Sequence, residues 1–153
     1  MKVLAILAVL YSPNLADFPK WKPEPCGRAR AEMTVQDLRY ISHLVNSQIT
    51  YVEDDVDYWQ TPKETEERGA GDCEDLAILK KSMLRRFFEH QDAEVVVAVT
   101  RYTEILHAVL RVFMADGNSY ILDNLEGDVL TEAEFKRRYR AVYAISDCGW
   151  RRL

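Results

Sequence analysis

The stretch RGAGDCEDLAILKKSML, residues 68–84, decides the fold, because it joins a glycine-rich turn to the strongest helical pattern in the chain. Downstream of Cys73, apolar residues recur every three or four positions, the spacing that gathers side chains on one face of a helix. We predict a helix from Cys73 to about His90. Its apolar stripe comprises Leu76, Ala77, Leu79, Met83, Leu84, Phe87 and Phe88. The bases that fall largely outside the stripe are Lys80, Lys81, Arg85 and Arg86.

Cys73 lies among three acids, Asp72, Glu74 and Asp75. Neighbouring carboxylates raise the pKa of a thiol, whereas a nucleophilic cysteine needs a lowered pKa. The two upstream glycines place Cys73 at the start of the helix, where backbone N–H groups and the helix dipole favour a thiolate. Cys73 is therefore a candidate nucleophile, and its acidic neighbours need an explanation of their own.

The composition is that of an ordinary globular domain. The 153 residues suffice for one domain with a sizeable core, and 48% of them are hydrophobic and 29% charged. The net charge of −5 and the lack of a basic stripe argue against nucleic acid as a partner. The basic cluster at residues 136–140 is interpreted as the solvated face of a helix.

The N-terminal region, residues 1–33, is predicted to be a lead-in to a domain that spans residues 34–153. A lysine and the apolar run VLAILAVLY, residues 3–11, fit a signal peptide that covers residues 1–16. The same run fits a buried strand or helix of the mature protein equally well. The first interpretation implies an exported or periplasmic protein, and the second leaves a cytoplasmic one. Nine apolar residues are too few for a transmembrane helix.

The chain has three cysteines, Cys26, Cys73 and Cys148, so at least one thiol is free. Cys26 and Cys148 can form a disulfide near the two ends of the chain, or both can be free. The sequence is compatible with either state. No C-x-x-C or cysteine–histidine spacing indicates a zinc site.

The hydrophobic period changes from helical to extended along the domain. Residues 51–62 interrupt the pattern and are expected to be a loop, with Pro62 in the first turn of a short helix. Besides the helix at Cys73, we predict helices over residues 35–48 and 132–140 and strands over residues 94–102, 105–114, 120–124 and 141–146. Helices that precede an antiparallel sheet indicate an α+β fold.

His107 is the histidine best placed for catalysis, whereas His43 and His90 are interpreted as surface or packing residues. The strands 105–114 and 120–124 are expected to pair across the turn ADGNS, residues 115–119. If Phe113 faces Ser119, then His107 is the diagonal neighbour of Asp123; a two-residue slip makes the two residues direct partners. Both registers place the two side chains on one face of the sheet.

Cys73, His107 and Asp123 can therefore serve as nucleophile, base and orienting carboxylate. Such triads occur in papain-like folds, with the nucleophile on a helix and the base on the sheet. Three segments in this order, around residues 57–85, 106–112 and 120–124, resemble the bacterial transglutaminase-like cysteine peptidases. That family includes the periplasmic LapG-type proteases. The resemblance implies a papain/transglutaminase-like fold and this triad.

The resemblance also gives the acids a role. LapG-type proteases bind calcium through carboxylates that flank the catalytic cysteine, which implies Asp72 and Glu74 as ligands with Asp75 adjacent. Oxygen ligands suit Ca²⁺. An ordinary N-terminal helix turn explains the same acids without a metal. Further oxygens are offered by the loop acids Asp54, Asp55 and Asp57.

The sequence thus predicts a calcium-dependent cysteine endopeptidase that acts on a protein. The backbone N–H of Cys73 and the indole N–H of Trp59 are candidate donors to the oxyanion, with simple packing as the other interpretation of Trp59. The resemblance further implies a surface adhesin as substrate and a membrane receptor as regulator. Alternative functions are transglutaminase-type amide transfer and binding without catalysis.

Overall fold

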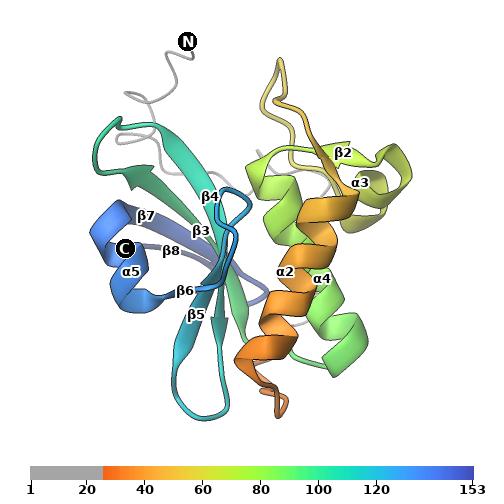
Figure 1. Cartoon of the computed structure of the whole chain (residues 1–153), viewed down its shortest axis with the longest axis vertical. Helices are drawn as coiled ribbons and strands as arrows, with labels where there is room; N and C mark the ends of the chain where they lie inside the picture. The colour runs from red at the N-terminus through yellow and green to blue at the C-terminus, as the bar shows by residue number, and fades with distance from the viewer. Residues whose placement is uncertain (1–25) are drawn as a thin grey trace.

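The computed structural model describes residues 26–153 (Figure 1). A helical layer packs on one face of an antiparallel sheet, which confirms the predicted α+β class. The elements in chain order are α2 (Val35–Gln48), β1 (Thr50–Tyr51), α3 (Pro62–Arg68), β2 (Ala70–Gly71), α4 (Cys73–Phe88), β3 (Ala93–Thr100), β4 (Leu106–Phe113), β5 (Ser119–Leu122), β6 (Leu130–Thr131), α5 (Glu132–Arg138), β7 (Tyr139–Ser146) and β8 (Gly149–Arg152).

The helices begin where the sequence supplies capping side chains. The hydroxyls of Thr34, Thr61 and Thr131 each accept a hydrogen bond from the backbone three residues on, in capping boxes that open α2, α3 and α5. Helix α2 covers residues 35–48 as predicted, and α4 begins at Cys73 as predicted. No helix in residues 26–153 combines the length and apolar character that crossing a membrane requires.

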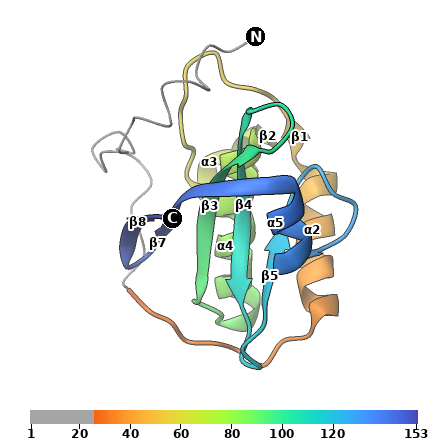
Figure 2. The same cartoon turned by 90° about the vertical axis from the view of Figure 1, so that its left-hand side faces the viewer.

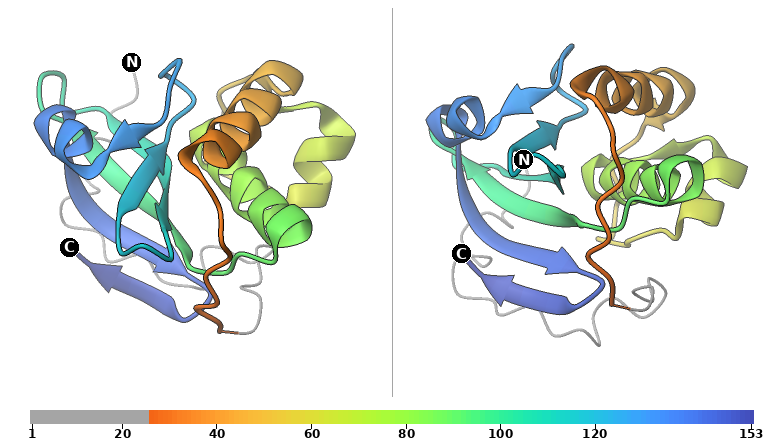
Figure 3. Two further views of the ribbon diagram at one scale, coloured as in Figure 1. Left: turned by 60° about the horizontal axis from the view of Figure 1, so that its bottom comes forward. Right: turned by 90° about the horizontal axis from the view of Figure 1, so that it is seen from below.

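Helix α4 is buried more completely than its apolar stripe indicates. It packs against α2 and α3 as well as against the sheet (Figures 1 and 3), so side chains outside the stripe are also covered. Lys80 is 1% exposed and Lys81 is 9% exposed, contrary to the expectation that they lie away from the core. Phe87, which the spacing assigned to the stripe, is 56% exposed, because the buried part of α4 ends at Leu84.

The six-stranded sheet has the order β6-β5-β4-β3-β7-β8. Phe113 faces Ser119 and Leu110 faces Leu122, which confirms one of the two predicted registers. The structure adds three features that were not predicted: the short strand β6, the C-terminal strand β8, and a short parallel pair of strands, β1 and β2. Strand β1 makes Tyr51 extended rather than part of a loop.

The sheet has a hydrophobic core on each face. The larger core lies between the sheet and helices α2 and α4, and the smaller one lies under α5, on the opposite face (Figure 2). Alternation along β4 divides its side chains between them: Ala108 and Leu110 belong to the larger core, and Val109 belongs to the smaller one.

Cys26 and Cys148 form a disulfide that links the start of the described chain to the β7–β8 turn. The same turn is held to α4 by an ion pair between Lys81 and Asp147, whose charged atoms lie 2.7 Å apart. Cys73 is the free cysteine among the described residues. The candidate signal peptide, residues 1–16, lies outside the described residues.

Candidate active site

The side chains of His107 and Asp123 are buried and in hydrogen-bond contact. Nε2 of His107 on β4 lies 2.6 Å from Oδ1 of Asp123, directly after β5. The side chains are 7% and 0% exposed. The observed register places Asp123 diagonally from His107. Because Nε2 is engaged with the carboxylate, Nδ1 is the ring nitrogen left for a thiol.

Three further donors surround Asp123. Its carboxylate accepts hydrogen bonds from the backbone N–H of Leu125 at 3.0 Å and the hydroxyl of Tyr139 at 2.9 Å, and the amide of Asn46 donates to its backbone oxygen at 3.2 Å. Burial alone would raise the pKa of Asp123, but the hydrogen bond and charge of His107, together with the other donors, lower it below its ordinary value. Asp123 is therefore held as a carboxylate.

Cys73 lies beside this pair. As the first residue of α4 it is held against β4, where its Sγ accepts a hydrogen bond at 3.4 Å from the backbone N–H of Ala108, the residue directly after His107. A helix start and a strand thus bring the thiol to the backbone next to His107, although Cys73 and His107 are 34 positions apart in the chain.

The thiol of Cys73 is turned toward an acid. Sγ lies 3.2 Å from Oε2 of Glu74, and none of the hydrogen bonds within residues 26–153 joins Sγ to His107. Burial and the negative charge of Glu74 raise the pKa of Cys73, while the Ala108 N–H lowers it. In this arrangement the thiol is protonated, and a thiolate needs the acid to be neutralised or moved.

Asp72 and Glu74 are buried acids without a cationic partner. They are 6% and 7% exposed, and no lysine or arginine of the described residues forms an ion pair with either. Burial raises the pKa of both, and for Glu74 the nearby Asp72 carboxylate raises it further. Oδ1 of Asp72 has no hydrogen-bond partner. An orphaned oxygen beside a second acid fits a hard cation such as Ca²⁺.

Asp75 differs from the other two acids because protein donors occupy it. Its carboxylate accepts the backbone N–H of Gln60 at 2.8 Å, the Gln60 side-chain amide, and the N–H of Asp72 at 3.1 Å, which completes the cap of α4. This carboxylate also explains Gly71, where a Cβ atom would lie 2.7 Å from Cβ of Asp75. Asp75 therefore fixes the geometry of the Cys73 turn.

A loop acid completes the acidic group. One carboxylate oxygen from each of Asp54, Asp72 and Asp75 lies within 4.8 Å of the others. Of the other two acids named from the sequence, Asp55 and Asp57 are exposed and lie outside this group. The structure thus brings Asp54 to the predicted site, while Glu74 points to the thiol.

Trp59 is 8% exposed and belongs to the larger core. His90 is buried and accepts the backbone N–H of Ala31 on Nδ1 at 3.0 Å, a structural contact, and His43 is exposed on α2. Sequence reasoning missed Tyr139, whose ring centroid lies 5.7 Å from that of His107. Tyr139 was predicted to lie in the helix 132–140 but begins β7, and no local pattern signals its contact with Asp123.

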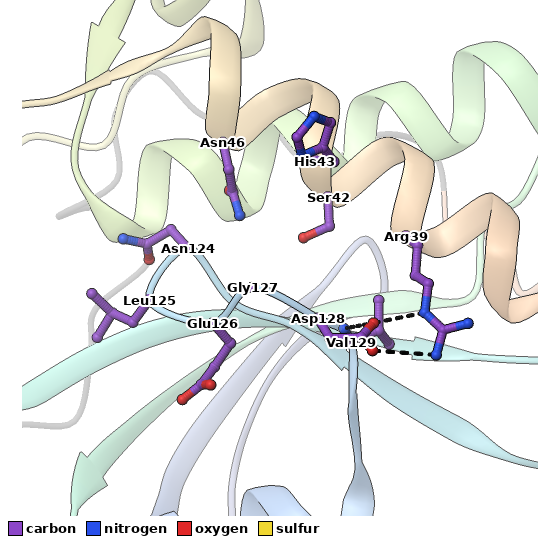
Figure 4. A pocket seen from close by; sticks show the side chains of 10 residues that line it. All are labelled: Arg39, Ser42, His43, Asn46, Asn124, Leu125, Glu126, Gly127, Asp128 and Val129. Carbon is purple, nitrogen blue, oxygen red and sulfur yellow. Dashed lines mark hydrogen bonds and ion pairs between the residues drawn. The ribbon is translucent and has the colours of Figure 1, made fainter.

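A polar crevice lies on the other side of Asp123 (Figure 4). It separates α2 from the segment 124–129 and has a volume of about 560 Å³. Asn46 lies at its α2 wall, and Asn124, the residue after Asp123, lies at the opposite wall. The crevice therefore adjoins the backbone of Asp123, the residue whose side chain holds His107.

The fold, with a cysteine at the start of a helix that packs on an antiparallel sheet, is that of the transglutaminase-like cysteine peptidases. A sequence model of the bacterial transglutaminase-like cysteine proteinases matches residues 20–150, and the chain belongs to that family. It is a cysteine peptidase, and its substrate is a protein. A comparison with the sequences of curated proteins gives no match.

Solved structures of Legionella pneumophila LapG share the fold. The calcium-bound form is 26% identical, with a TM-score of 0.69 over 80% of this chain and 71% of that one. A second LapG structure is 24% identical, with a TM-score of 0.62 over 92% and 81%. The EGTA-treated form is 23% identical, with a TM-score of 0.63 over 92% and 78%. These matches confirm the predicted papain/transglutaminase-like architecture.

Proposed function

We propose that the chain hydrolyses peptide bonds through Cys73, His107 and Asp123. His107 takes the thiol proton on Nδ1, and the thiolate attacks the peptide carbonyl carbon to form a tetrahedral intermediate. Its collapse breaks the C–N bond, and His107 returns the proton to the leaving amine. Water, deprotonated by His107, then hydrolyses the thioester and releases the acid and the thiol.

The observation that carries this proposal is the contact of 2.6 Å between Nε2 of His107 and Oδ1 of Asp123. The thiol of Cys73 lies 3.4 Å from the backbone nitrogen of Ala108, the residue after His107. Asp123 fixes the tautomer and stabilises the imidazolium once it forms. We further propose that the backbone N–H of Cys73 and the indole N–H of Trp59 donate to the oxyanion. For the reaction, the thiol must turn from Glu74 toward His107.

The test measures alkylation of Cys73 by iodoacetamide and cleavage of a peptide library followed by mass spectrometry. We expect His107→Ala to slow alkylation at pH 7 and to abolish cleavage, while His43→Ala, a matched change of an exposed histidine, alkylates as wild type does. Equal alkylation of the wild type and His107→Ala would refute a working pair. Cross-linked products would indicate amide transfer, and an unchanged library would indicate a binding module.

We also propose that Asp72 and Glu74 hold calcium, with Asp75 and Asp54 contributing oxygens. The calcium-bound and EGTA-treated forms of Legionella pneumophila LapG support this, as does the orphaned oxygen of Asp72. Bound calcium would supply positive charge that offsets the acids beside the thiol. Glu74 would then no longer accept the thiol proton, so Cys73 would be free to face His107.

Calcium is tested by its effect on the melting temperature and on the alkylation rate of Cys73. Adding calcium to EDTA-treated wild type should raise the melting temperature, because the ion would bind the folded state and not the unfolded one. It should also raise the alkylation rate, because the positive charge would offset the acids beside the thiol. Asp72→Asn should remove both responses, and Asp55→Asn, a change of the exposed acid next to Asp54, should keep them. If calcium changes neither quantity in the wild type, the acids form only a helix cap.

We propose that the enzyme works outside the cytoplasm, in an exported or periplasmic state. The Cys26–Cys148 disulfide supports this, because disulfides persist in oxidising compartments. The similarity to LapG-type proteases extends the proposal to a surface adhesin as substrate and a membrane receptor as regulator. Fractionation of cells that make the full chain, with a thiol count of the recovered protein, tests the compartment; recovery of reduced protein from the cytoplasm would refute it.

A further inference from the structure

The crevice behind Asp123 is built by α2 and the segment that leads from β5 to β6 (Figure 4). Its volume of about 560 Å³ is within the range of ligand sites, roughly 300 to 1,000 Å³. Its walls carry more polar than apolar side chains. The lining residues are Arg39, Ser42, His43, Asn46, Asn124, Leu125, Glu126, Gly127, Asp128 and Val129.

The centre of the crevice holds a polar group without a partner. Ser42 is 7% exposed, forms no hydrogen bond with the described residues, and points its hydroxyl into the crevice (Figure 4). The side-chain oxygens of Asn46 and Asn124, which also lack hydrogen-bond partners among the described residues, are shielded from the crevice. Buried polar groups normally have partners, so the Ser42 hydroxyl favours a ligand that brings its own hydrogen-bonding group.

The charges around the crevice are already neutralised. Arg39 at one end forms an ion pair with Asp128, with Nε and Oδ1 2.6 Å apart, and Glu126 is paired with Arg138. A charged ligand would have to compete with these pairs. An uncharged ligand rich in N–H and C=O groups would not, and the backbone of a polypeptide has this chemistry.

The crevice adjoins the backbone of Asp123 through two residues. Asn46 donates to the backbone oxygen of Asp123, and Asn124 follows Asp123 in the chain. We infer that the crevice is a subsite that binds the backbone of the protein substrate on one side of the scissile bond, with the Ser42 hydroxyl as a hydrogen-bonding group. This inference rests on the proposed peptidase function and assigns it a substrate-binding surface.

The test uses the peptide that wild type cleaves fastest in the library described above. Ser42→Leu places a larger apolar side chain in the crevice and should raise the KM for this peptide about tenfold or more, with kcat nearly unchanged. Alkylation of Cys73 by iodoacetamide should not change, because this small reagent needs no subsite. Ser47→Leu, an exposed serine on the same helix, should leave KM unchanged.

A second variant guards against misfolding at the buried serine. Gly127 lines the crevice, and a Cβ atom added there meets nothing within 4 Å, so Gly127→Leu fills the space from the loop side. It should raise KM as Ser42→Leu does. Unchanged KM in Gly127→Leu would overturn the subsite while leaving the peptidase proposal intact. A library that wild type leaves uncleaved would instead refute the peptidase proposal, and the subsite with it.

Discussion

Two buried acidic regions of this molecule, Asp123 at the end of β5 and the Asp72–Glu74 pair at the start of α4, are in opposite electrostatic states. Asp123 receives hydrogen bonds from His107, Leu125 and Tyr139, and its pKa is lowered despite burial. The pKa values of Asp72 and Glu74 are raised by burial and, for Glu74, by mutual repulsion.

The comparison shows that burial alone does not decide the state of a carboxylate. What decides it is the number of donors that the fold supplies. The fold completes the environment of Asp123 with a strand, a loop and a tyrosine. It leaves Asp72 with an oxygen that has no partner among the described residues, which is the observation behind the proposed calcium site.

The strongest test of the complete region is Asp123→Asn. The substitution keeps the shape but removes the negative charge that orients and stabilises His107, so we expect kcat/KM to fall by about three to four orders of magnitude. Asp116→Asn, a change of an exposed turn carboxylate, serves as control and should retain full activity. A loss of less than tenfold in Asp123→Asn would remove Asp123 from the triad.

The incomplete region is tested by the stability of the calcium-free protein as the pH changes. Because Asp72 and Glu74 keep their protons to higher pH in the folded state than in the unfolded one, the free energy of unfolding should fall as the pH rises above about 4. The slope is at most about 1.4 kcal/mol per pH unit for each retained proton. Calorimetry in EDTA measures it.

Two additions isolate the source of that slope. Glu74→Gln should flatten it, because the amide has no proton to lose, and saturating calcium should raise wild-type stability most at the upper end of the pH range. If the free energy of unfolding of the wild type in EDTA stays constant from pH 4 to pH 8 and calcium does not change it, the pKa values of Asp72 and Glu74 are not raised, and the two acidic regions do not differ as described.

A third buried group reports on the charge of Asp123. Burial lowers the pKa of Lys80 to about 7, and the negative charge of Asp123 opposes this shift. The unfolded chain therefore holds one more proton on Lys80 between pH 7 and about 10, so Lys80 contributes a rise in stability of up to about 1.4 kcal/mol per pH unit there, which opposes the fall contributed by Glu74. Lys80→Met should be more stable at pH 7, and its advantage should shrink toward pH 10.

Lys81→Met is the matched control for Lys80→Met. It removes the neighbouring lysine of α4 and breaks the pair with Asp147, so it should lose stability without this pH trend. In the background of Asp123→Asn, the pKa of Lys80 should fall further because the opposing charge is gone. An identical pH dependence in wild type and Lys80→Met would show that Lys80 is charged in the folded state.

The sequence predicted best those features that depend on residues close together in the chain. The predicted starts of the helices over residues 35–48 and 132–140 were confirmed, and the turn after Phe113 set the register that brings Asp123 toward His107. The contacts it could not reveal join distant segments. Tyr139 reaches Asp123 from β7, and Lys80 is buried although the periodicity of α4 places it outside the apolar stripe.

The disulfide between Cys26 and Cys148 has a topological consequence for an enzyme that cuts polypeptides. Every loop between these residues lies within one covalent ring, including the exposed turn at residues 101–105. A single cut in that ring opens it into one continuous, still linked molecule rather than two fragments. Copies of the enzyme that nick one another would therefore stay whole until a second cut or a reductant separates the pieces.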